Sequence, residues 1–274
     1  MPEANQSNLW DEDEELAVGA GGAAGTGNRE IAPGEPTVVC ENVEITYRVF
    51  EDRRPTLRSV VANRFKGRSY RAIEAVKDVS FTAYAGEAVG VIGSNGSGKS
   101  TLLRAIGGLL PVTAGQIYVR GKPALLGVGA ALQPKVSGRR NVILGGLALG
   151  LTREEVEARF DEIVEFAGLE DAIDLPLRTY SSGMRARLHF AISSAVRPDI
   201  LLIDEALAVG DKAFKERSQE RMEELKADAG TIFLVSHSMG VIKGTCTRAL
   251  WLEQGMIKAD GKPREVIKAY DAAT

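Results

Sequence analysis

The sequence contains no apolar run of the ~18–20 residues that a helix needs to cross a lipid bilayer. It also has no excess of positive charge, because 34 lysines and arginines face 37 aspartates and glutamates, for a net charge of −3. A dedicated nucleic-acid-binding domain is normally basic, so we expect no nucleic-acid partner. The N-terminal stretch MPEANQSNLWDEDEE is acidic and has neither a basic region nor an apolar core, so we expect no secretory signal peptide.

Cysteine is scarce as well. Cys40 and Cys246 are far apart in the sequence and show no metal-ligand spacing, so we expect buried thiols in a reducing compartment. The remaining composition, 44% hydrophobic and 26% charged residues, is that of an ordinary globular protein. A chain of 274 residues is long enough for one large domain, with or without a smaller one.

The chain divides into an N-terminal tail and an ordered part. Residues 1–36 carry eight acidic residues and one basic residue and end in a Gly/Ala-rich stretch, which predicts a disordered tail. Within residues 37–274, buried strand patterns alternate with helical patterns, which predicts an α/β fold with a parallel sheet covered on both faces. Two segments differ from this alternation: a basic insertion at 48–71 containing a short amphipathic helix, and a helix-rich stretch at about 135–196.

The strongest motif is GSNGSGKST, residues 93–101, which fits the pattern G-x-x-x-x-G-K-[ST] between an apolar strand and a helix. Glycines let such a loop curl so that its N–H groups point at phosphate oxygens, and the following helix adds its positive dipole end. We expect Lys99 to neutralise the β and γ phosphates, Ser100 to bind Mg²⁺, and Thr101 to donate to the α phosphate side. The candidate nucleotide-binding residues of this motif are Gly93, Ser94, Asn95, Gly96, Ser97, Gly98, Lys99, Ser100 and Thr101.

Two further apolar strands end in polar residues. The segment ILLIDE places Asp204 and Glu205 at a strand end, where Asp204 would hold the Mg²⁺ shell and Glu205 would polarise the attacking water. The segment VSHS places His237 at the end of the next buried strand, on the same sheet edge. There it would either hydrogen-bond a γ phosphate or serve as a satisfied structural histidine.

A second anion-binding pattern lies at YSSGMRARL, residues 180–188, where small residues open a helix. Taken in order, GSNGSGKST, YSSGM, ILLIDE and VSHS resemble the nucleotide-binding subunit of ABC transporters over residues 37–262. The resemblance implies a P-loop NTPase fold with a RecA-like core, an antiparallel β subdomain and an α-helical signature subdomain.

The same resemblance implies ATP and Mg²⁺ as cofactors and assigns roles to single residues. Tyr47 would stack on adenine, Ser182 and Gly183 would form the centre of the signature motif, and Asp211 would close the D-loop ALAVGD. Glu205 and His237 would be the catalytic residues. The family usually has a glutamine at the position of Val128, and the only nearby glutamine is Gln133, which either takes over that role or does not.

Three segments, YSSGM, LAVGD and LLGVGAALQPKVSGRRN, are similar to ATPase subunits that export polysaccharides such as O-antigen, teichoic acid and galactan. This implies a lipid-linked polysaccharide as cargo, a homodimer of ATPase subunits, and two copies of a membrane permease that bind it at the cytoplasmic face of the plasma membrane. Arg139, Arg140 and Asn141, with the apolar VILGGLALGL that follows them, would either contact the permease or pack within the helical stretch. Because the sequence ends at Thr274, we also expect no C-terminal sugar-binding domain. The basic insertion would lie against anionic headgroups or pack on its own domain.

Other classes explain the sequence less well. A repair ATPase would carry a long coiled-coil insertion, and a translation ATPase would usually carry two such domains. A P-loop kinase or GTPase has no need of YSSGM or LAVGD. An ABC subunit for another cargo, such as a lipid or a drug, stays open.

Overall fold

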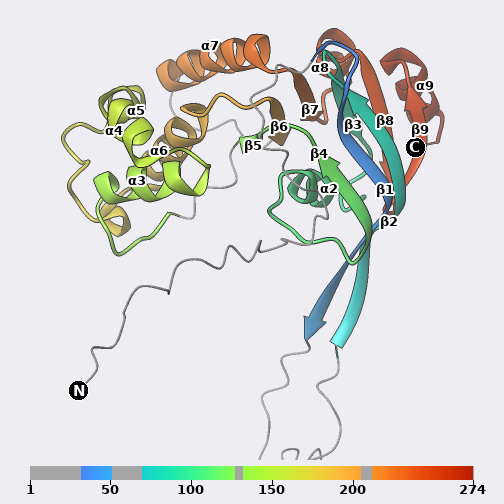
Figure 1. The fold of residues 1–274 in the computed structure, drawn as a ribbon, viewed down its shortest axis with the longest axis horizontal. Helices are drawn as coiled ribbons and strands as arrows, with labels where there is room; N and C mark the ends of the chain where they lie inside the picture. Colours follow the sequence, from blue (N-terminus) through green and yellow to red (C-terminus); the bar gives the residue numbers. More distant parts are fainter. Residues whose placement is uncertain (1–31, 51–69, 127–131, 205–211, 274) are drawn as a thin grey trace, which may run out of the picture.

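The computed structural model describes residues 32–50, 70–126, 132–204 and 212–273 (Figure 1). The helix expected within 48–71, Val128, Glu205 and the D-loop with Asp211 lie outside these described residues, as does most of the expected N-terminal tail. Among the described residues, no helix is long and apolar enough to span a membrane.

A six-stranded sheet forms the centre of the fold, with the strand order β5-β6-β7-β3-β8-β9. Neighbouring strands pair in parallel from β5 to β8, and β9 pairs antiparallel with β8 as a hairpin at the edge. The predicted parallel α/β sheet is thereby confirmed. Its strands are β3 (Ala88–Ile92), β5 (Pro123–Leu126), β6 (Ile200–Asp204), β7 (Thr231–Val235), β8 (Arg248–Glu253) and β9 (Met256–Gly261).

Both faces of this sheet are covered, which explains why inner strands such as β3 are apolar throughout. Alternate residues of one strand enter two different cores: Leu202 of β6 belongs to one cluster, and Leu201 and Ile203 belong to the other. Helix α2 (Lys99–Ile106) supplies Leu102 and Leu103 to the first cluster. The helices that supply the second cluster are α7 (Lys212–Asp228), α8 (Met239–Thr245) and α9 (Pro263–Ala273).

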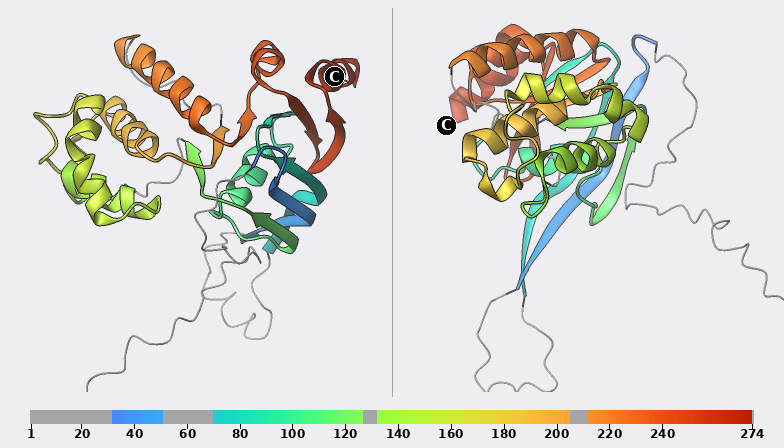
Figure 2. Two further views of the ribbon diagram at one scale, coloured as in Figure 1. Left: turned by 45° about the horizontal axis from the view of Figure 1, so that its top comes forward. Right: turned by 90° about the vertical axis from the view of Figure 1, so that its left-hand side faces the viewer.

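A second, antiparallel sheet has the strand order β2-β1-β4 and covers α2 from the far side. Strand β1 pairs with β2 along its whole length but with β4 only up to Glu44, so β1 and β2 continue beyond the body as a two-stranded ribbon (Figures 1 and 2). This is the expected antiparallel β subdomain. Its strands are β1 (Pro36–Phe50), β2 (Tyr70–Tyr84) and β4 (Ala114–Val119).

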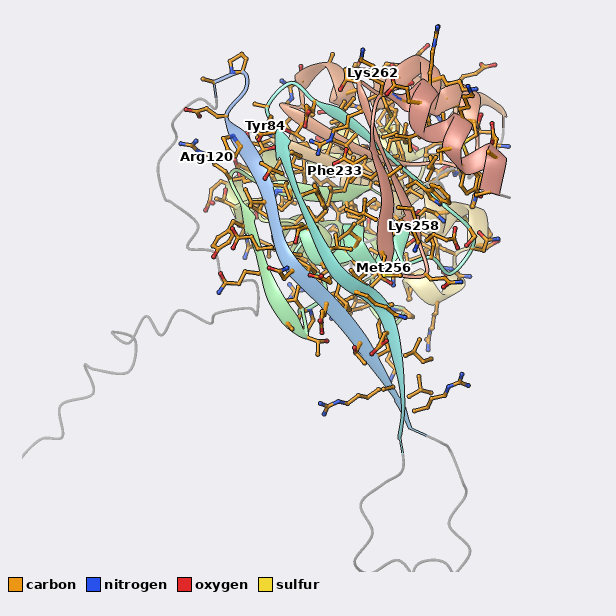
Figure 3. The ribbon with its side chains drawn as sticks, turned by 90° about the vertical axis from the view of Figure 1, so that its right-hand side faces the viewer. Tyr84, Arg120, Phe233, Met256, Lys258 and Lys262 are labelled. Carbon is orange, nitrogen blue, oxygen red and sulfur yellow. The ribbon has the colours of Figure 1, made fainter. Side chains whose placement is uncertain are left out.

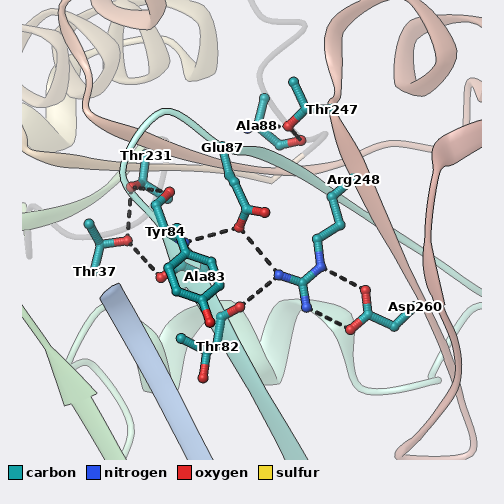
Figure 4. Close-up of polar contacts among 10 residues, drawn as sticks. All are labelled: Thr37, Thr82, Ala83, Tyr84, Glu87, Ala88, Thr231, Thr247, Arg248 and Asp260. Carbon is teal, nitrogen blue, oxygen red and sulfur yellow. Dashed lines mark hydrogen bonds and ion pairs between the residues drawn. The ribbon is translucent and has the colours of Figure 1, made fainter. Parts of the chain in front are cut away.

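Arg248 at the start of β8 ties the two sheets together (Figure 4). Its guanidinium donates two hydrogen bonds of 2.7 Å to the carboxylate of Asp260 and one of 2.7 Å to the backbone oxygen of Thr82 in β2. Glu87 adds a third partner at 3.3 Å. The Thr37 hydroxyl of β1 lies 2.9 Å from that of Thr231 in β7 and closes the same junction on its other side.

The third part of the fold, here called the helical group, comprises the helices from α3 to α6 and has a hydrophobic core of its own. It confirms the helix-rich stretch expected at about 135–196. The rings of Phe166, Phe190 and Phe214 pack together and join this group to α7. Its helices are α3 (Gly138–Ala148), α4 (Arg153–Ala158), α5 (Phe160–Ala167), the short 3₁₀ helix η1 (Leu177–Thr179) and α6 (Ser182–Ser194).

Candidate functional site

Residues 93–98, here called the phosphate loop, connect the end of β3 to the start of α2. Gly93 and Gly98 are required there by the surrounding backbone. A Cβ on Gly93 would lie 1.9 Å from the carbonyl oxygen of Leu252, and a Cβ on Gly98 would lie 2.3 Å from that of Ala75. Both glycines also have positive φ angles, 144° and 106°, which residues with a side chain rarely adopt.

Lys99 begins α2 and folds back over the loop. Its side chain is buried, and Nζ donates hydrogen bonds to the backbone oxygens of Gly93 at 2.8 Å and Ser94 at 2.7 Å. No acidic residue occupies the first turn of α2, so the ammonium group and the helix N-terminus present positive charge together. The curl of the loop, the missing Cβ atoms and this charge fit a phosphate group.

The two candidate Mg²⁺ ligands, Ser100 and Asp204, lie on different elements of the fold. Ser100 lies in the first turn of α2, and Asp204 is the last residue of β6, where it is partly buried beside Val235. A hydroxyl and a carboxylate are the hard oxygen ligands that Mg²⁺ prefers, so these side chains fit the ion chemically. Glu205, the expected base, lies outside the described residues.

His237 follows β7, and β7 is the direct neighbour of β3 in the sheet. Its side chain is exposed, and it stands between Ser236, which is buried, and Ser238, which caps α8. The carboxyl ends of parallel strands meet at one sheet edge, so the topology brings His237, Asp204 and the phosphate loop to the same edge.

Tyr47 reaches this edge from the other sheet. Its hydroxyl lies 3.3 Å from the hydroxyl of Thr101 in the first turn of α2. An aromatic ring from β1 therefore stands beside the start of the helix that follows the phosphate loop.

The signature residues lie elsewhere. Ser181 caps α6 by accepting a hydrogen bond from the backbone N–H of Met184, Ser182 is exposed, and Gly183 is partly exposed. Helix α6 lies among the helical group, whereas α2 lies between the two sheets (Figures 1 and 2). A single chain therefore does not bring Ser182 and Gly183 onto its own phosphate loop.

One expectation about partner contacts is wrong. Asn141 cannot contact a permease because it is fully buried. Its Oδ1 accepts a hydrogen bond of 2.6 Å from the backbone N–H of Gln133, and its Nδ2 lies 3.1, 3.3 and 2.9 Å from the oxygens of Gln133, Val136 and Ser137. Arg139 and Arg140 are exposed, and Arg139 pairs with Asp174. Asn141 thus shapes the turn that begins at Gln133, whose own side chain is exposed.

Sequence reasoning missed Glu253, at the end of β8. Its carboxylate accepts hydrogen bonds from the side-chain hydroxyl of Ser94 at 2.5 Å and from the backbone N–H of Ser94 at 3.3 Å. The available signal was weak, because only the pairing of β8 with β3 places this residue against the phosphate loop.

Comparison with known proteins gives this arrangement a family. The family model named ABC transporter matches residues 76–208, which include the phosphate loop, Lys99, the signature segment and Asp204. The chain is 46% identical over 209 residues to the O-antigen export system ATP-binding protein RfbB of Myxococcus xanthus, across 76% of this chain and 48% of that protein. Residues 76–208 therefore form an ABC transporter domain.

A second relative in this family is the teichoic acids export ATP-binding protein TagH of Lactococcus lactis, 46% identical over 197 residues, which are 72% of this chain and 42% of that protein. The chain thus spans about half the length, or less, of both curated relatives. It is similar over the part that these ABC transporter proteins share.

Solved structures agree with the fold. The dimeric post-hydrolysis structure of the ATP-binding cassette MJ0796 bound to ADP and Pi matches with a TM-score of 0.61 and 25% identity, over 83% of this chain and 99% of that one. A structure described as the ATP-binding subunit of an ABC transporter matches with a TM-score of 0.62 and 22% identity, over 86% of this chain and 93% of that one. The α/β architecture described above is therefore that of an ABC ATPase cassette.

Proposed function

We propose that this chain is the ATP-hydrolysing subunit of an ABC exporter that moves a lipid-linked polysaccharide across the cytoplasmic membrane. The observation that carries the ATP-binding part is the phosphate loop itself. It has two glycines that the surrounding backbone requires, a buried lysine folded over the loop, and a helix N-terminus behind it.

Each residue then has a task on the nucleotide. Lys99 exchanges backbone oxygens for the β and γ phosphate oxygens of ATP, and Tyr47 stacks on the adenine ring. Glu205 polarises the attacking water and His237 holds the γ phosphate. Mg²⁺, held by Ser100 and Asp204, supplies positive charge to the phosphates.

Two copies of the chain are needed to complete each site. Ser182 and Gly183 lie in the helical group, so the phosphate they bind belongs to a second copy that packs head to tail. The matching structures of the cassette MJ0796 are dimeric, which supports this arrangement. Gln133 is the candidate for the glutamine near the Mg²⁺ ion in this pair, and Asn141 holds the turn that carries it.

The cargo and the membrane partner are inferred from the relatives. Their names specify O-antigen export and teichoic acid export, and both are lipid-linked polysaccharides. We therefore infer a permease that binds two copies of this chain at the cytoplasmic face of the membrane, with Arg139 and Arg140 near the contact. The basic insertion 48–71 is a second candidate for contact with the membrane.

The proposal is tested by depleting the protein in its own host and measuring lipid-linked glycan on the cytoplasmic side and on the outer side of the membrane. We expect lipid-linked glycan to accumulate on the cytoplasmic side of the membrane. Wild-type protein should restore export, and a Lys99→Ala variant expressed at the same level should not. Normal export during depletion would contradict the polysaccharide assignment, and full rescue by Lys99→Ala would contradict the role of ATP.

A further inference from the structure

The turn between β8 and β9 lies against the phosphate loop. Strand β8 is the parallel neighbour of β3, with Trp251 opposite Ile92, and it continues for two more residues beside the point where the chain leaves β3. Figure 3 shows this edge of the sheet, with Met256 marking the first residue of β9. The turn of residues 252–255 therefore forms one wall of the phosphate loop.

Two backbone contacts hold this wall and the loop together. The carbonyl oxygen of Leu252 occupies the space where a Cβ on Gly93 would lie. At the other end of the loop, the backbone N–H of Gly255 donates a hydrogen bond of 3.0 Å to the oxygen of Ser97. Between them lies Ser94, whose carbonyl oxygen accepts hydrogen bonds from Lys99 Nζ and the Ser97 N–H, and whose own N–H and hydroxyl face the turn.

Glu253 supplies that side chain. One carboxylate oxygen accepts from the Ser94 hydroxyl at 2.5 Å, and the other accepts from the Ser94 backbone N–H at 3.3 Å. The indole N–H of Trp251 donates to that second oxygen at 3.4 Å. The Trp251 ring packs edge-on against Tyr270 of α9, with centroids 5.6 Å apart, so the donor is itself held in place.

The charge of Glu253 suits this contact. The hydrogen bond from the Ser94 side chain is the largest cause that lowers the pKa of Glu253, and the positive charge of Lys99 acts in the same direction. The carboxylate is therefore ionised at neutral pH, and charge-assisted hydrogen bonds are stronger than neutral ones.

We propose that Glu253 is a positioning residue, which holds Ser94 and so keeps the phosphate loop in the shape that binds ATP. A loop with three glycines has many alternative conformations, and fixing one of them before the ligand arrives raises affinity. This inference rests on the proposed ATP-binding function and assigns a role to a residue 159 positions away from its partner in the sequence.

A double-mutant cycle in the full chain tests the inference, with a fluorescent ATP analogue as the probe of affinity. Glu253→Ala should weaken binding about ten-fold, the size expected for losing hydrogen bonds to a charged group. Ser94→Ala should weaken binding to a similar degree. The loss in the double variant should fall well below the product of the two single losses, because both substitutions remove the same side-chain hydrogen bond. Glu265→Ala on α9 removes an exposed carboxylate and serves as the charge-matched control with unchanged affinity.

Two outcomes would overturn the inference: wild-type affinity in Glu253→Ala, or effects of the two substitutions that multiply in the double variant. If Glu253→Ala does not fold, Glu253→Gln carries the same expectation. Its amide oxygen has no full negative charge, and its amide nitrogen cannot accept the second hydrogen bond. Wild-type and Lys99→Ala proteins are measured in parallel. Equal, negligible binding by those two would refute the ATP site itself, whereas normal wild-type binding confines any failure to Glu253.

Discussion

A buried ammonium group is stable only when hydrogen bonds replace its water, and in Lys99 two backbone oxygens do so. Both oxygens belong to the phosphate loop, so the lysine keeps the loop curled around its own charge. Phosphate oxygens can take the place of these acceptors without moving the side chain into water. The residue is thus prepared for an anion by the same contacts that stabilise it in the fold.

The shape of the loop can be tested at Gly93. In Gly93→Ala the new Cβ meets the oxygen of Leu252, and the φ of 144° is unfavourable for alanine. We expect the free energy of unfolding to fall by about 2–4 kcal/mol and nucleotide binding to be lost. Equilibrium urea unfolding and ATP titration measure the two effects.

Gly108→Ala is the matched control, because Gly108 also has a positive φ, 69°, but no atom lies within 4 Å of the added Cβ. It should cost only about 1 kcal/mol and leave ATP binding intact. An equal loss of stability and of binding in both variants would show that backbone conformation, rather than the approach of Leu252, makes Gly93 necessary.

At the same scale, the sequence was informative where chemistry is local. The spacing of Gly93, Gly98 and Lys99 predicted a phosphate loop because all three act on one short stretch of chain. It was uninformative for Glu253, whose partner Ser94 is brought near by the order of strands in the sheet. For Asn141 a polar residue beside two arginines suggested a partner contact, whereas its amide is buried and pairs with backbone groups of the turn that begins at Gln133.

Among the elements, the start of α3 and the segment before α6 are in close contact within the helical group. A Cβ on Gly138 would lie 2.2 Å from the hydroxyl of Tyr180, which itself donates to the oxygen of Ala172 at 2.6 Å. Burial raises the pKa of this tyrosine, so the hydroxyl keeps its proton. The segments SGRRN and YSSGM therefore pack against each other at Gly138 and Tyr180.

The part played by Asn141 predicts a large effect of an apolar replacement of similar size. In Asn141→Leu, the N–H of Gln133 and the nearby carbonyl oxygens face an apolar side chain instead of the buried amide that pairs them. We expect a loss of about 3 kcal/mol in the free energy of unfolding, because each unsatisfied buried group costs about 1–3 kcal/mol. Urea unfolding followed by circular dichroism measures it.

Arg153→Ala serves as the control in the same group, since its ion pair with Glu157 is exposed. Such pairs contribute less than about 1 kcal/mol. If Asn141→Leu were as stable as Arg153→Ala, the hydrogen bonds of Asn141 would not determine the turn.

For the whole molecule, the alternation of strands and helices was enough to predict a parallel sheet covered on both faces, because burial of both faces requires continuous apolar runs. The same pattern does not contain the strand order, which follows from pairings between distant parts of the chain, such as that of β3 with β7. The most important feature at this scale is that the phosphate loop and the signature residues of one chain lie apart in space. Our account requires a second copy to bring them together.

That requirement is tested most directly by mixing two inactive variants and measuring ATP hydrolysis. Lys99→Ala removes the phosphate-loop charge, and Gly183→Asp places a carboxylate where the partner's phosphate would bind. Each variant alone should be inactive. In a mixed pair, the intact loop of the Gly183→Asp copy faces the intact signature of the Lys99→Ala copy, so one of its two sites is complete. We predict that the mixture hydrolyses ATP, and a mixture as inactive as its two components would contradict the account.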